Sequence, residues 1–333
     1  MGRRLKHFIH LLEALLVLLV FLLAYNFLLP VGEGQKVLFF DANTPQTVLK
    51  TLKKNGYSTT RFDAWLIPKA QLPIKGWYHI GHNDEGRWHF FHALKRSPLS
   101  EMRIIVYPGE THREILSRLA NDMKLDPEKL QKIYKTYAHY PEGEILAGTY
   151  TLARSADENT TLNYLFERSN AQFDAFKTRY FDKPVDAYTF KLLMIIASII
   201  QKESNKPEEM PLISSVIYNR IEKGMKLQMD GTLNYGNYSH RIVTPERIKE
   251  DATYYNTYRY KGLPPAPLAS FSMEALKAAL FPARSDFLFF MLTPDGSHSF
   301  AADYATHLKN LKAFREYQKK RKAQLDKDAN ATR

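Results

Sequence analysis

Near its start the sequence has a predominantly apolar segment, with His10 and Glu13 close to its basic end, that is long enough to cross a lipid bilayer. Residues 8–29 are overwhelmingly Leu, Val, Phe and Ala, and Arg3, Arg4 and Lys6 precede them. About 20 apolar residues in a helix span the hydrocarbon core of a membrane. A cleavable signal peptide usually has a shorter apolar region that ends at small residues, whereas the segment after Ala24 continues with Phe and Leu. We therefore expect an uncleaved transmembrane helix at 8–29.

The charge around this helix predicts where the rest of the chain lies. Basic residues before a span stay in the cytoplasm, so residues 1–7 are expected to be a cytoplasmic tail of a single-pass protein of the cell (inner) membrane. Everything after the helix is then periplasmic or otherwise extracytoplasmic, which argues against nucleic acid as a partner. The formal charge of +12 is spread along the chain, and it suits anionic lipid or an acidic wall polymer equally well.

Two segments that follow the apolar helix resemble each other and predict a pair of small modules. Thr44–Leu52 matches Thr111–Leu119 in spacing and character, and each follows a short β-type run. Each threonine is a predicted helix N-cap, and Glu114 completes a capping box with the second one. We expect strand–helix–strand modules at 30–100 and 101–184, the second with an additional helix that Asp126 caps and Pro127 begins. Chance similarity of two amphipathic segments is the alternative.

The chain changes character after Pro184, where a third region is predicted. Asp186 is the expected cap of an apolar helix that ends near Ser204, and shorter helices, loops and strands follow. We interpret 185–318 as a mixed α+β domain and the lysine-rich end, 319–333, as a basic disordered tail. The predicted fold class is therefore α+β, with a transmembrane helix, small α/β modules and a larger mixed domain.

The most apolar helix of the third region ends in an acid, Glu203. On a helix, Leu192, Ile196, Ile199 and Ile200 share a face with this residue. A carboxylic acid in an apolar wall has a raised pKa and can hold a proton near neutral pH, which is the property of a general acid. The alternative is that Glu203 merely marks the end of the helix and the return to water, together with its polar neighbours.

Other catalytic chemistries fit the sequence poorly. The chain has no cysteine, and no histidine pair has a helical ligand spacing beside acids, so neither thiol catalysis nor a metal site is expected. No phosphate-binding glycine loop or nucleophile elbow occurs, and no cofactor is expected. Ser198 lies within the helix, where its hydroxyl would bond to the preceding turn. Asp230 and Glu208 are the nearby candidates for the second carboxylate of a hydrolytic glycosidase, and neither has an apolar setting.

Several polar and aromatic residues after Glu203 could stack on or hydrogen-bond to a sugar polymer. Taken singly, each could equally shape a turn, and His298 could orient another group, bind substrate or be purely structural. These candidates are Gln228, Tyr235, Asn256, Thr257, Tyr258 and His298.

Six short motifs then carry a resemblance to a known family. In order they are Ala197–Ser204, Tyr218–Ile221, Leu227–Thr232, Tyr255–Tyr258, Gly262–Pro265 and His298–Phe300. This order resembles the MltG/YceG-like endolytic lytic transglycosylases over about 30 to 318. The resemblance implies that the small modules are LysM-like, that Glu203 is the catalytic residue, and that Asp230 and Thr232 join the substrate-binding residues.

The resemblance also implies a reaction. These enzymes cut peptidoglycan between N-acetylmuramic acid (MurNAc) and N-acetylglucosamine (GlcNAc) without water, leaving 1,6-anhydroMurNAc ends. Glu203 would protonate the bridging oxygen and then take a proton from the C6 hydroxyl of MurNAc. Implied partners are glycan strands, the bilayer and peptidoglycan synthases, with nascent strands as substrate and termination of glycan elongation as outcome. The alternatives are a non-catalytic wall-binding scaffold and a lysozyme-like hydrolase.

The sequence departs from the family pattern in three places. Gly231 stands where the family usually has Pro after the aspartate, and Ala266 stands where it has Gly. The end of the second module, Glu142–Tyr150, lacks the usual Pro-Asp before Thr-Tyr. The third departure puts substrate contact from that segment in doubt, while the first two change loop shape.

Overall fold

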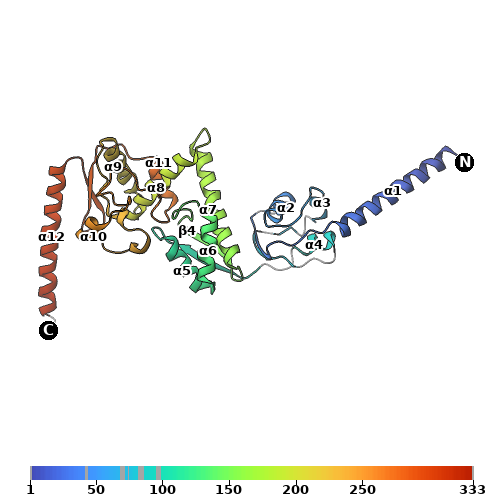
Figure 1. Cartoon of the computed structure of the whole chain (residues 1–333), viewed down its shortest axis with the longest axis horizontal. Coiled ribbons are helices and arrows are strands. Elements are labelled where there is room, and N and C mark those ends of the chain that lie inside the picture. The colour runs from blue at the N-terminus through green and yellow to red at the C-terminus, as the bar shows by residue number, and fades with distance from the viewer. Residues whose placement is uncertain are drawn as a thin grey trace. The chain divides into compact units, whose positions relative to one another are not determined.

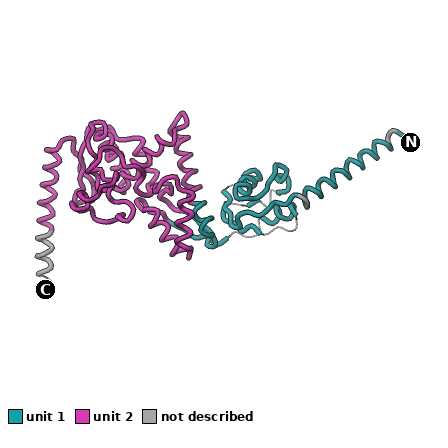
Figure 2. Tube along the Cα trace, viewed as in Figure 1, with its two compact units in different colours: residues 1–104, 151–164 teal, residues 105–150, 165–333 magenta. Residues whose placement is uncertain are grey.

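A computed structural model describes residues 2–41, 44–67, 72–73, 75–81, 86–94 and 99–331. Over this part of the chain the fold is mixed α+β and mostly helical, with three two-stranded sheets (Figure 1). The chain divides into two compact units, residues 1–104 with 151–164, and residues 105–150 with 165–333 (Figure 2). The mixed α+β class agrees with the sequence, whereas the division at 30–100, 101–184 and 185–318 stays a prediction.

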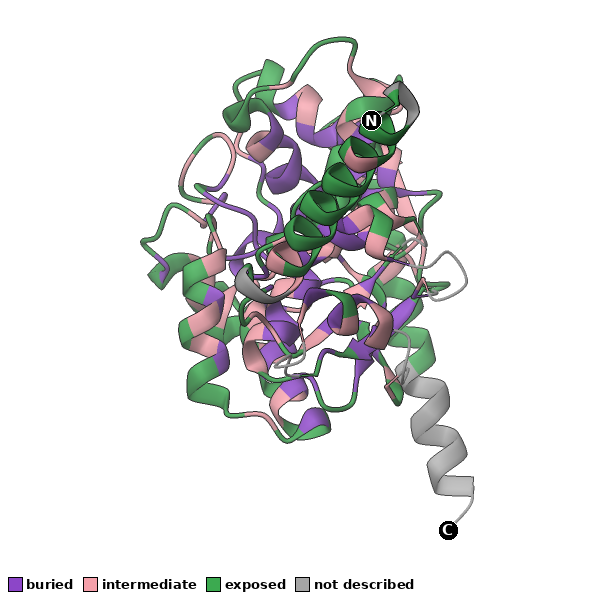
Figure 3. Ribbon diagram, turned by 90° about the vertical axis from the view of Figure 1, so that its right-hand side faces the viewer, coloured by how far each residue is buried: buried purple, intermediate pink, exposed green. Residues whose placement is uncertain are grey.

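Helix α1 (Arg3–Leu28) contains the apolar segment at the N-terminus. Its window Leu5–Asn26 has a mean hydropathy of 2.5 and none of it is buried, as the exposed surface of this helix in Figure 3 illustrates. The helix is thus long and apolar enough to cross a membrane, as predicted, and a signal sequence near the N-terminus would meet the same criterion.

The first small module has the predicted strand–helix–strand order. Strand β1 (Val37–Phe40) pairs antiparallel with β2 (Gly76–His79), and α2 (Pro45–Lys54) begins at the predicted N-cap, Thr44, whose side chain accepts from the amide of Thr47. Two shorter helices complete it, α3 (Asp63–Leu66) and α4 (Arg87–Ala93). Apolar side chains of the strands and helices form its core, among them Leu38, Phe40, Val48, Leu52 and Phe91.

The second module repeats this order with the additional helix that the sequence predicts. Its elements are β3 (Glu101–Val106), α5 (His112–Met123), α6 (Pro127–Tyr137) and β4 (Gly148–Ala153), and β3 pairs with β4. Thr111 and Glu114 form the predicted capping box of α5. Asp126 caps α6, as predicted, by accepting from the amides of Glu128 and Lys129.

The core of the remaining region is helical. Its central helix, α8 (Ala187–Glu203), packs against α9 (Met210–Glu222) and α11 (Met273–Leu280). Apolar side chains from these three helices and the loops between them are buried together. The other elements are α7 (Glu158–Tyr180), the 3₁₀ turns η2 (Asp230–Leu233) and η3 (Gly236–Tyr238), α10 (Pro245–Glu250), the antiparallel pair β5 (Phe289–Leu292) and β6 (His298–Ala301), and α12 (Tyr304–Ala331).

The C-terminal tail, 319–333, falls mainly outside the residues whose side chains are described. Helix α12 carries described side chains as far as Arg321, and residues 332–333 are not described. The predicted disorder of this tail therefore stays a prediction.

Candidate active site

Helix α8 places an acid at the edge of the apolar core. Its first turn is held by Asp186, which accepts from the amide of Thr189 at 2.9 Å, as the sequence predicts. An unbroken run of buried residues, 193–201, then passes through the core. The helix ends because Ser204 adopts extended backbone angles. Glu203 is thus the last helical residue, and its side chain reaches the loop that carries η2.

The surroundings of Glu203 favour its protonated form. The pKa of this carboxyl is raised to about 7. Desolvation by burial is the largest cause, the hydrogen bond from the amide of Gly231 lowers the pKa, and the negative charge of Asp230 raises it. Part of the side-chain surface still reaches solvent. The acid is therefore enclosed enough to hold a proton near neutral pH and open enough to deliver it to a ligand.

Gly231 approaches Glu203 more closely than any residue with a side chain could without displacing its neighbours. Its amide donates to Oε1 of Glu203 at 2.8 Å. A Cβ atom at this position would lie 2.7 Å from that oxygen and 2.8 Å from Cβ of Lys202. The absence of a side chain therefore permits the contact, and the free amide supplies the donor.

A second carboxylate, Asp230, is held beside this contact by a tyrosine. Asp230 is exposed at the start of η2 and accepts from Oη of Tyr258 at 2.6 Å. The pKa of Tyr258 is raised by burial and then by the hydrogen bond to the aspartate, so the phenol stays a donor. Glu203, Asp230 and Tyr258 are thus brought together from α8, η2 and the loop after α10.

Three of the predicted sugar-binding residues lie inside the loops rather than on their surface. Thr232, Asn256 and Thr257 have at most 1% of their surface exposed. The two threonine hydroxyls bond to each other at 2.8 Å, and the Asn256 amide donates to the carbonyls of Ile248 and Asp251, each at 2.8 Å. These contacts fix the shape of the loops that carry Asp230 and Tyr258, and a direct contact of the three with substrate stays a prediction.

Gln228 is exposed and its backbone has a φ of +52°. Its Oε1 accepts from Arg220 at 3.2 Å. Buried Arg220 also donates to the carbonyls of Leu227, at 2.8 Å, and Leu288, at 2.6 Å. Arg220 thus orients the start of the loop, a role that we did not predict although the residue belongs to the second of the six motifs.

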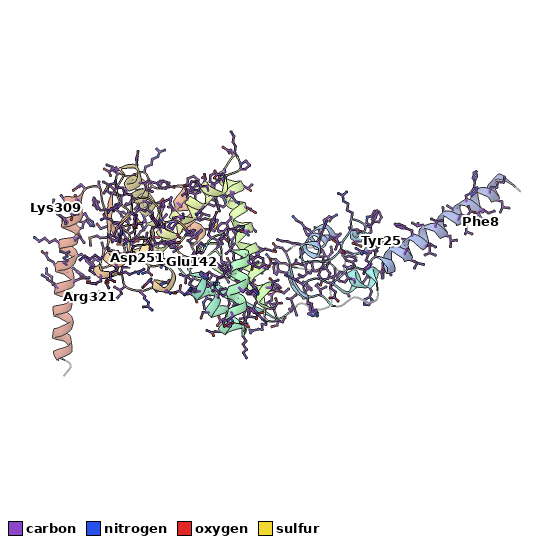
Figure 4. The ribbon with its side chains drawn as sticks, viewed as in Figure 1. Phe8, Tyr25, Glu142, Asp251, Lys309 and Arg321 are labelled. Atoms are coloured by element: carbon purple, nitrogen blue, oxygen red, sulfur yellow. The ribbon has the colours of Figure 1, made fainter. Side chains whose placement is uncertain are left out.

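Tyr235 stacks on Tyr255, with ring centroids 4.3 Å apart. Its hydroxyl bonds to Thr253 at 2.7 Å and donates to Asp251 at 3.2 Å. The tyrosine pair borders a cavity of about 240 Å³ that is also lined by His112 and Glu142, and Glu203 is not among its lining residues. Figure 4 labels Glu142 and Asp251 in this unit.

His298 is tied to the end of α8 through another carboxylate. Its amide donates to Glu209 at 2.8 Å and its Nδ1 lies 2.7 Å from the same carboxylate. Glu209 also accepts from the hydroxyl of Ser204 at 3.0 Å. Because Ser204 follows the candidate acid directly, this chain of contacts gives His298 a positioning role, and its contact with substrate stays a prediction.

Lys202 and Glu114 belong to the same neighbourhood, although the sequence did not single them out for it. Nζ of Lys202 donates to Ser239 at 3.0 Å, and the Ser239 hydroxyl donates to Glu114 at 3.1 Å. Burial lowers the pKa of Lys202, which the charges of Glu114 and Glu142 partly oppose. In the alternative interpretation of the helix end Lys202 marks the return to water, whereas in the structure it is half-buried and bonds to Ser239, which is distant in sequence.

Ser198 behaves as expected, since its hydroxyl donates to the carbonyl of Ile195 at 2.7 Å. No group of three or more His, Cys, Asp or Glu side chains that could hold a metal ion occurs within the described ranges.

A family model described as YceG-like matches residues 41–313, which include every side chain of this site. The chain belongs to the YceG-like family. The match extends over most of the chain, from β2 and α2 of the first module to the first turns of α12, and it agrees with the resemblance that the six motifs carry.

Named relatives match about half of the chain. A Bacillus subtilis (strain 168) protein named endolytic murein transglycosylase is 30% identical over 179 residues, which are 53% of this chain and 48% of that protein. A Streptococcus pneumoniae (strain D39) protein of the same name is 29% identical over 177 residues, 51% of this chain and 31% of that protein. The chain thus aligns with half or less of the length of these relatives.

A solved structure shows the same fold. The crystal structure of a putative YceG-like protein from Listeria monocytogenes superposes with a TM-score of 0.52 at 21% sequence identity, covering 83% of this chain and 99% of that one. At this identity the likeness concerns the fold alone.

Two of the three departures from the YceG-like pattern make hydrogen bonds, and the third is buried. Gly231 provides the amide that bonds to Glu203, which a proline could not do. In the altered end of the second module, Glu142 accepts from the first amide of α5, that of His112, at 2.7 Å, and Glu144 accepts from the amide of His139 at 3.0 Å. Ala266 is buried, with 6% of its surface exposed.

Proposed function

We propose that this protein is a membrane-anchored endolytic lytic transglycosylase that cuts the MurNAc–GlcNAc bond of peptidoglycan and leaves 1,6-anhydroMurNAc ends. The observation that carries the proposal is Glu203, enclosed at the end of an apolar helix with a pKa near 7 and a single amide donor. Membership of the YceG-like family and the names of the two relatives support the same activity.

Glu203 acts twice in the proposed reaction. As an acid it protonates the oxygen between the two sugars, so the bond to C1 of MurNAc breaks as GlcNAc leaves. As a carboxylate it then accepts the proton of the MurNAc C6 hydroxyl while that oxygen bonds to C1. The proton balance closes without water, and a pKa close to the working pH suits a group that must give and then take one proton.

The remaining site residues have supporting roles in this mechanism. Asp230, held by Tyr258, faces the developing positive charge at C1, since a fixed negative charge stabilises an oxocarbenium-like transition state. Gln228 and Tyr235 are exposed enough to contact sugar, and Thr232, Asn256, Thr257 and His298 maintain the loops. The proposed reaction uses no cofactor.

The anchor and the charge suggest the setting of the reaction. In our proposal α1 remains attached, the N-terminus is cytoplasmic, and the enzyme acts outside the cytoplasm on nascent strands, ending their elongation beside the peptidoglycan synthases. Glycan strands and the bilayer are its partners, and the LysM-like modules add glycan contacts.

Replacing Glu203 by Gln tests the activity. The variant keeps the size of the side chain and its contact with Gly231, but its amide has no acidic proton to give to the glycosidic oxygen. We expect purified wild-type protein to release anhydro-ended muropeptides from isolated sacculi, and Glu203→Gln to release none at an unchanged melting temperature. Anhydro ends formed by the variant would refute the assignment.

The same digest separates the two rival functions. A wall-binding scaffold would sediment with sacculi and create no new ends. A lysozyme-like hydrolase would create reducing ends, with Asp230 as its second carboxylate. The exposed position of Asp230 and its hydrogen bond with Tyr258 favour a role in charge stabilisation over activation of water.

A further inference from the structure

Three large aromatic side chains of the first unit are exposed. The exposed fractions are 68% for Phe62, 90% for Trp65 and 56% for Trp88. Single exposed apolar residues are common on protein surfaces, whereas a group of large aromatic rings at one place indicates contact with another apolar phase. The question is therefore whether these rings share a location.

Their location is set by the last turns of α1. The ring of Phe62 packs edge-on against that of Tyr25, with centroids 6.3 Å apart. The amide of Trp88 donates to Oδ1 of Asn26 at 2.7 Å. Trp65 lies one helical turn after Phe62, in α3. The exposed rings of Phe62, Trp65 and Trp88 are therefore carried by α3, by the residue that precedes it and by α4, near the end of the apolar helix, where Figure 4 labels Tyr25.

A buried ion pair locks the two short helices to this helix end. Arg87 donates to Asp63 through Nε at 2.6 Å and through Nη2 at 2.9 Å, and neither side chain is more than 2% exposed. Oη of Tyr25 donates to the same aspartate at 2.8 Å. Arg87 also donates to the carbonyl of Leu29, and its guanidinium lies over the Tyr25 ring, 5.1 Å from the centroid.

The chain segments also approach each other closely at this junction. Gly86, directly before α4, has a φ of +90°, and a Cβ there would lie 2.8 Å from Nδ2 of Asn26. Gly86 therefore lets the start of α4 approach Asn26 more closely than a residue with a side chain would.

These contacts indicate how deep the three rings lie relative to the membrane. The apolar window of α1 ends at Asn26, so Tyr25 and Asn26 lie at the membrane–water boundary if α1 spans the bilayer. The ring of Phe62 touches Tyr25 and the backbone of Trp88 touches Asn26, so both residues lie near this depth, and Trp65 follows Phe62 by one helical turn. Trp and Tyr concentrate at this boundary because their rings are apolar and their polar atoms remain hydrated.

We propose that Phe62, Trp65 and Trp88 form a membrane face that rests in the interface of the lipid leaflet into which α1 emerges. The proposal depends on the membrane anchor that we propose above and goes beyond the reaction. Its occupant is lipid, and the argument for lipid is continuity of the face with the apolar surface of α1. Arg61, exposed beside Phe62, is placed to meet anionic headgroups.

The three tryptophans of the chain permit a direct test. Trp77 is only 1% exposed and donates through Nε1 to the carbonyl of Thr151 at 2.7 Å, so it serves as an internal control. The full-length protein is reconstituted in phosphatidylcholine–phosphatidylglycerol vesicles that carry bromine either near the headgroup or deep in the acyl chains. Tryptophan emission is measured for wild type, Trp65→Phe, Trp88→Phe and the double variant, in which only Trp77 emits.

We expect shallow bromine to quench wild type and both single variants, deep bromine to quench them less, and the double variant to lose most of the response. Wild-type emission that is insensitive to bromine in protein retained by the vesicles would overturn the membrane face and leave the anchor intact. Equal quenching of the double variant would overturn it as well. Emission that changes with the protein-to-lipid ratio instead would assign the face to a second copy of the chain.

Failure of the anchor is distinguishable from failure of the membrane face. If an alkaline carbonate wash removes the full-length protein from the vesicles, α1 does not span the bilayer and both proposals fall. The muropeptide digest with Glu203→Gln is independent of either result, because it reports on the reaction alone.

Discussion

The amide of Gly231 donates a hydrogen bond to Oε1 of Glu203 at 2.8 Å. This contact lowers the pKa of the carboxyl and so works against burial, and the pKa that results from all these effects is about 7. The result is an acid balanced between its two protonation states at neutral pH. A stronger set of donors would leave it ionised, and an apolar pocket without a donor would leave it permanently protonated.

The pH dependence of the reaction follows from this balance. Only protonated Glu203 can donate to the glycosidic oxygen, and a carboxyl loses its proton as pH rises through its pKa, here about 7. We expect kcat/KM to fall by about tenfold per pH unit on the alkaline side. The rate of anhydro-end formation against pH measures this, with sedimentation of Glu203→Gln on sacculi as the control for binding. An activity that still rises above pH ~8 would contradict this assignment of the general acid.

Glycine at position 231 should be required for activity. In Gly231→Ala the added Cβ would lie 2.7 Å from Oε1 of Glu203 and 2.8 Å from Cβ of Lys202, so the carboxylate must move. Misplacing a catalytic group by about 1 Å can cost about 100-fold in rate. We expect a loss of this order in kcat together with a lower melting temperature, because Cβ of Lys202 cannot rotate away from the new methyl group. Gly81→Ala, whose Cβ would meet no atom within 4 Å, is the matched control and should keep full activity.

The contact between Tyr258 and Asp230 should affect the reaction more than the fold. Tyr258→Phe removes the 2.6 Å hydrogen bond and keeps the ring. One hydrogen bond to a charged group contributes about 1.5–3 kcal/mol, so we expect kcat/KM to drop by about 10-fold or more. Tyr254→Phe, at a tyrosine that is 71% exposed, is the control. If the losses of activity in Tyr258→Phe and Asp230→Asn simply add up in the double variant, the two residues do not act as a pair.

The contact of Glu209 with His298 and Ser204 predicts a loss of stability. Glu209→Gln weakens the hydrogen bonds to His298 at 2.7 and 2.8 Å and to Ser204 at 3.0 Å. Leaving buried partners poorly satisfied costs about 1–3 kcal/mol, which thermal unfolding will show as a lower melting temperature. Glu208→Gln, at the exposed neighbour, should change nothing. An unchanged melting temperature with lost activity would instead indicate that His298 contacts substrate.

Local sequence signals predicted the elements of this fold well. The caps at Thr44, Thr111, Asp126 and Asp186 form as expected, because N-capping depends on a side chain and amides within three residues of it. The apolar run that ends at Glu203 is a helix for the same reason, since its periodicity and its break are both written in adjacent residues.

The contacts that tune the site were not predictable in this way. The amide of Gly231 reaches Glu203 across 28 positions of sequence, and the ammonium group of half-buried Lys202 bonds to Ser239, which follows it by 37 positions. One interpretation of the helix end had Lys202 facing water. The residue types of Asn256 and Thr257, and the resemblance in the case of Thr232, gave these buried residues the same sugar-binding interpretation as exposed Gln228. Burial depends on which distant segments pack together, and no local pattern encodes that.

Glu114 has a consequence for how the protein can be taken apart. Its carboxylate caps α5 through Thr111, at 2.7 Å from the amide, and also accepts from Ser239 at 3.1 Å, so one side chain serves a repeat-like module and the loops near Glu203. A fragment that starts at 185 would lose this carboxylate and that of Glu142, the two acids whose charges act on Lys202. Helix α5 of the second module and the region around Glu203 should therefore be inherited, exchanged or expressed together, as one evolutionary unit.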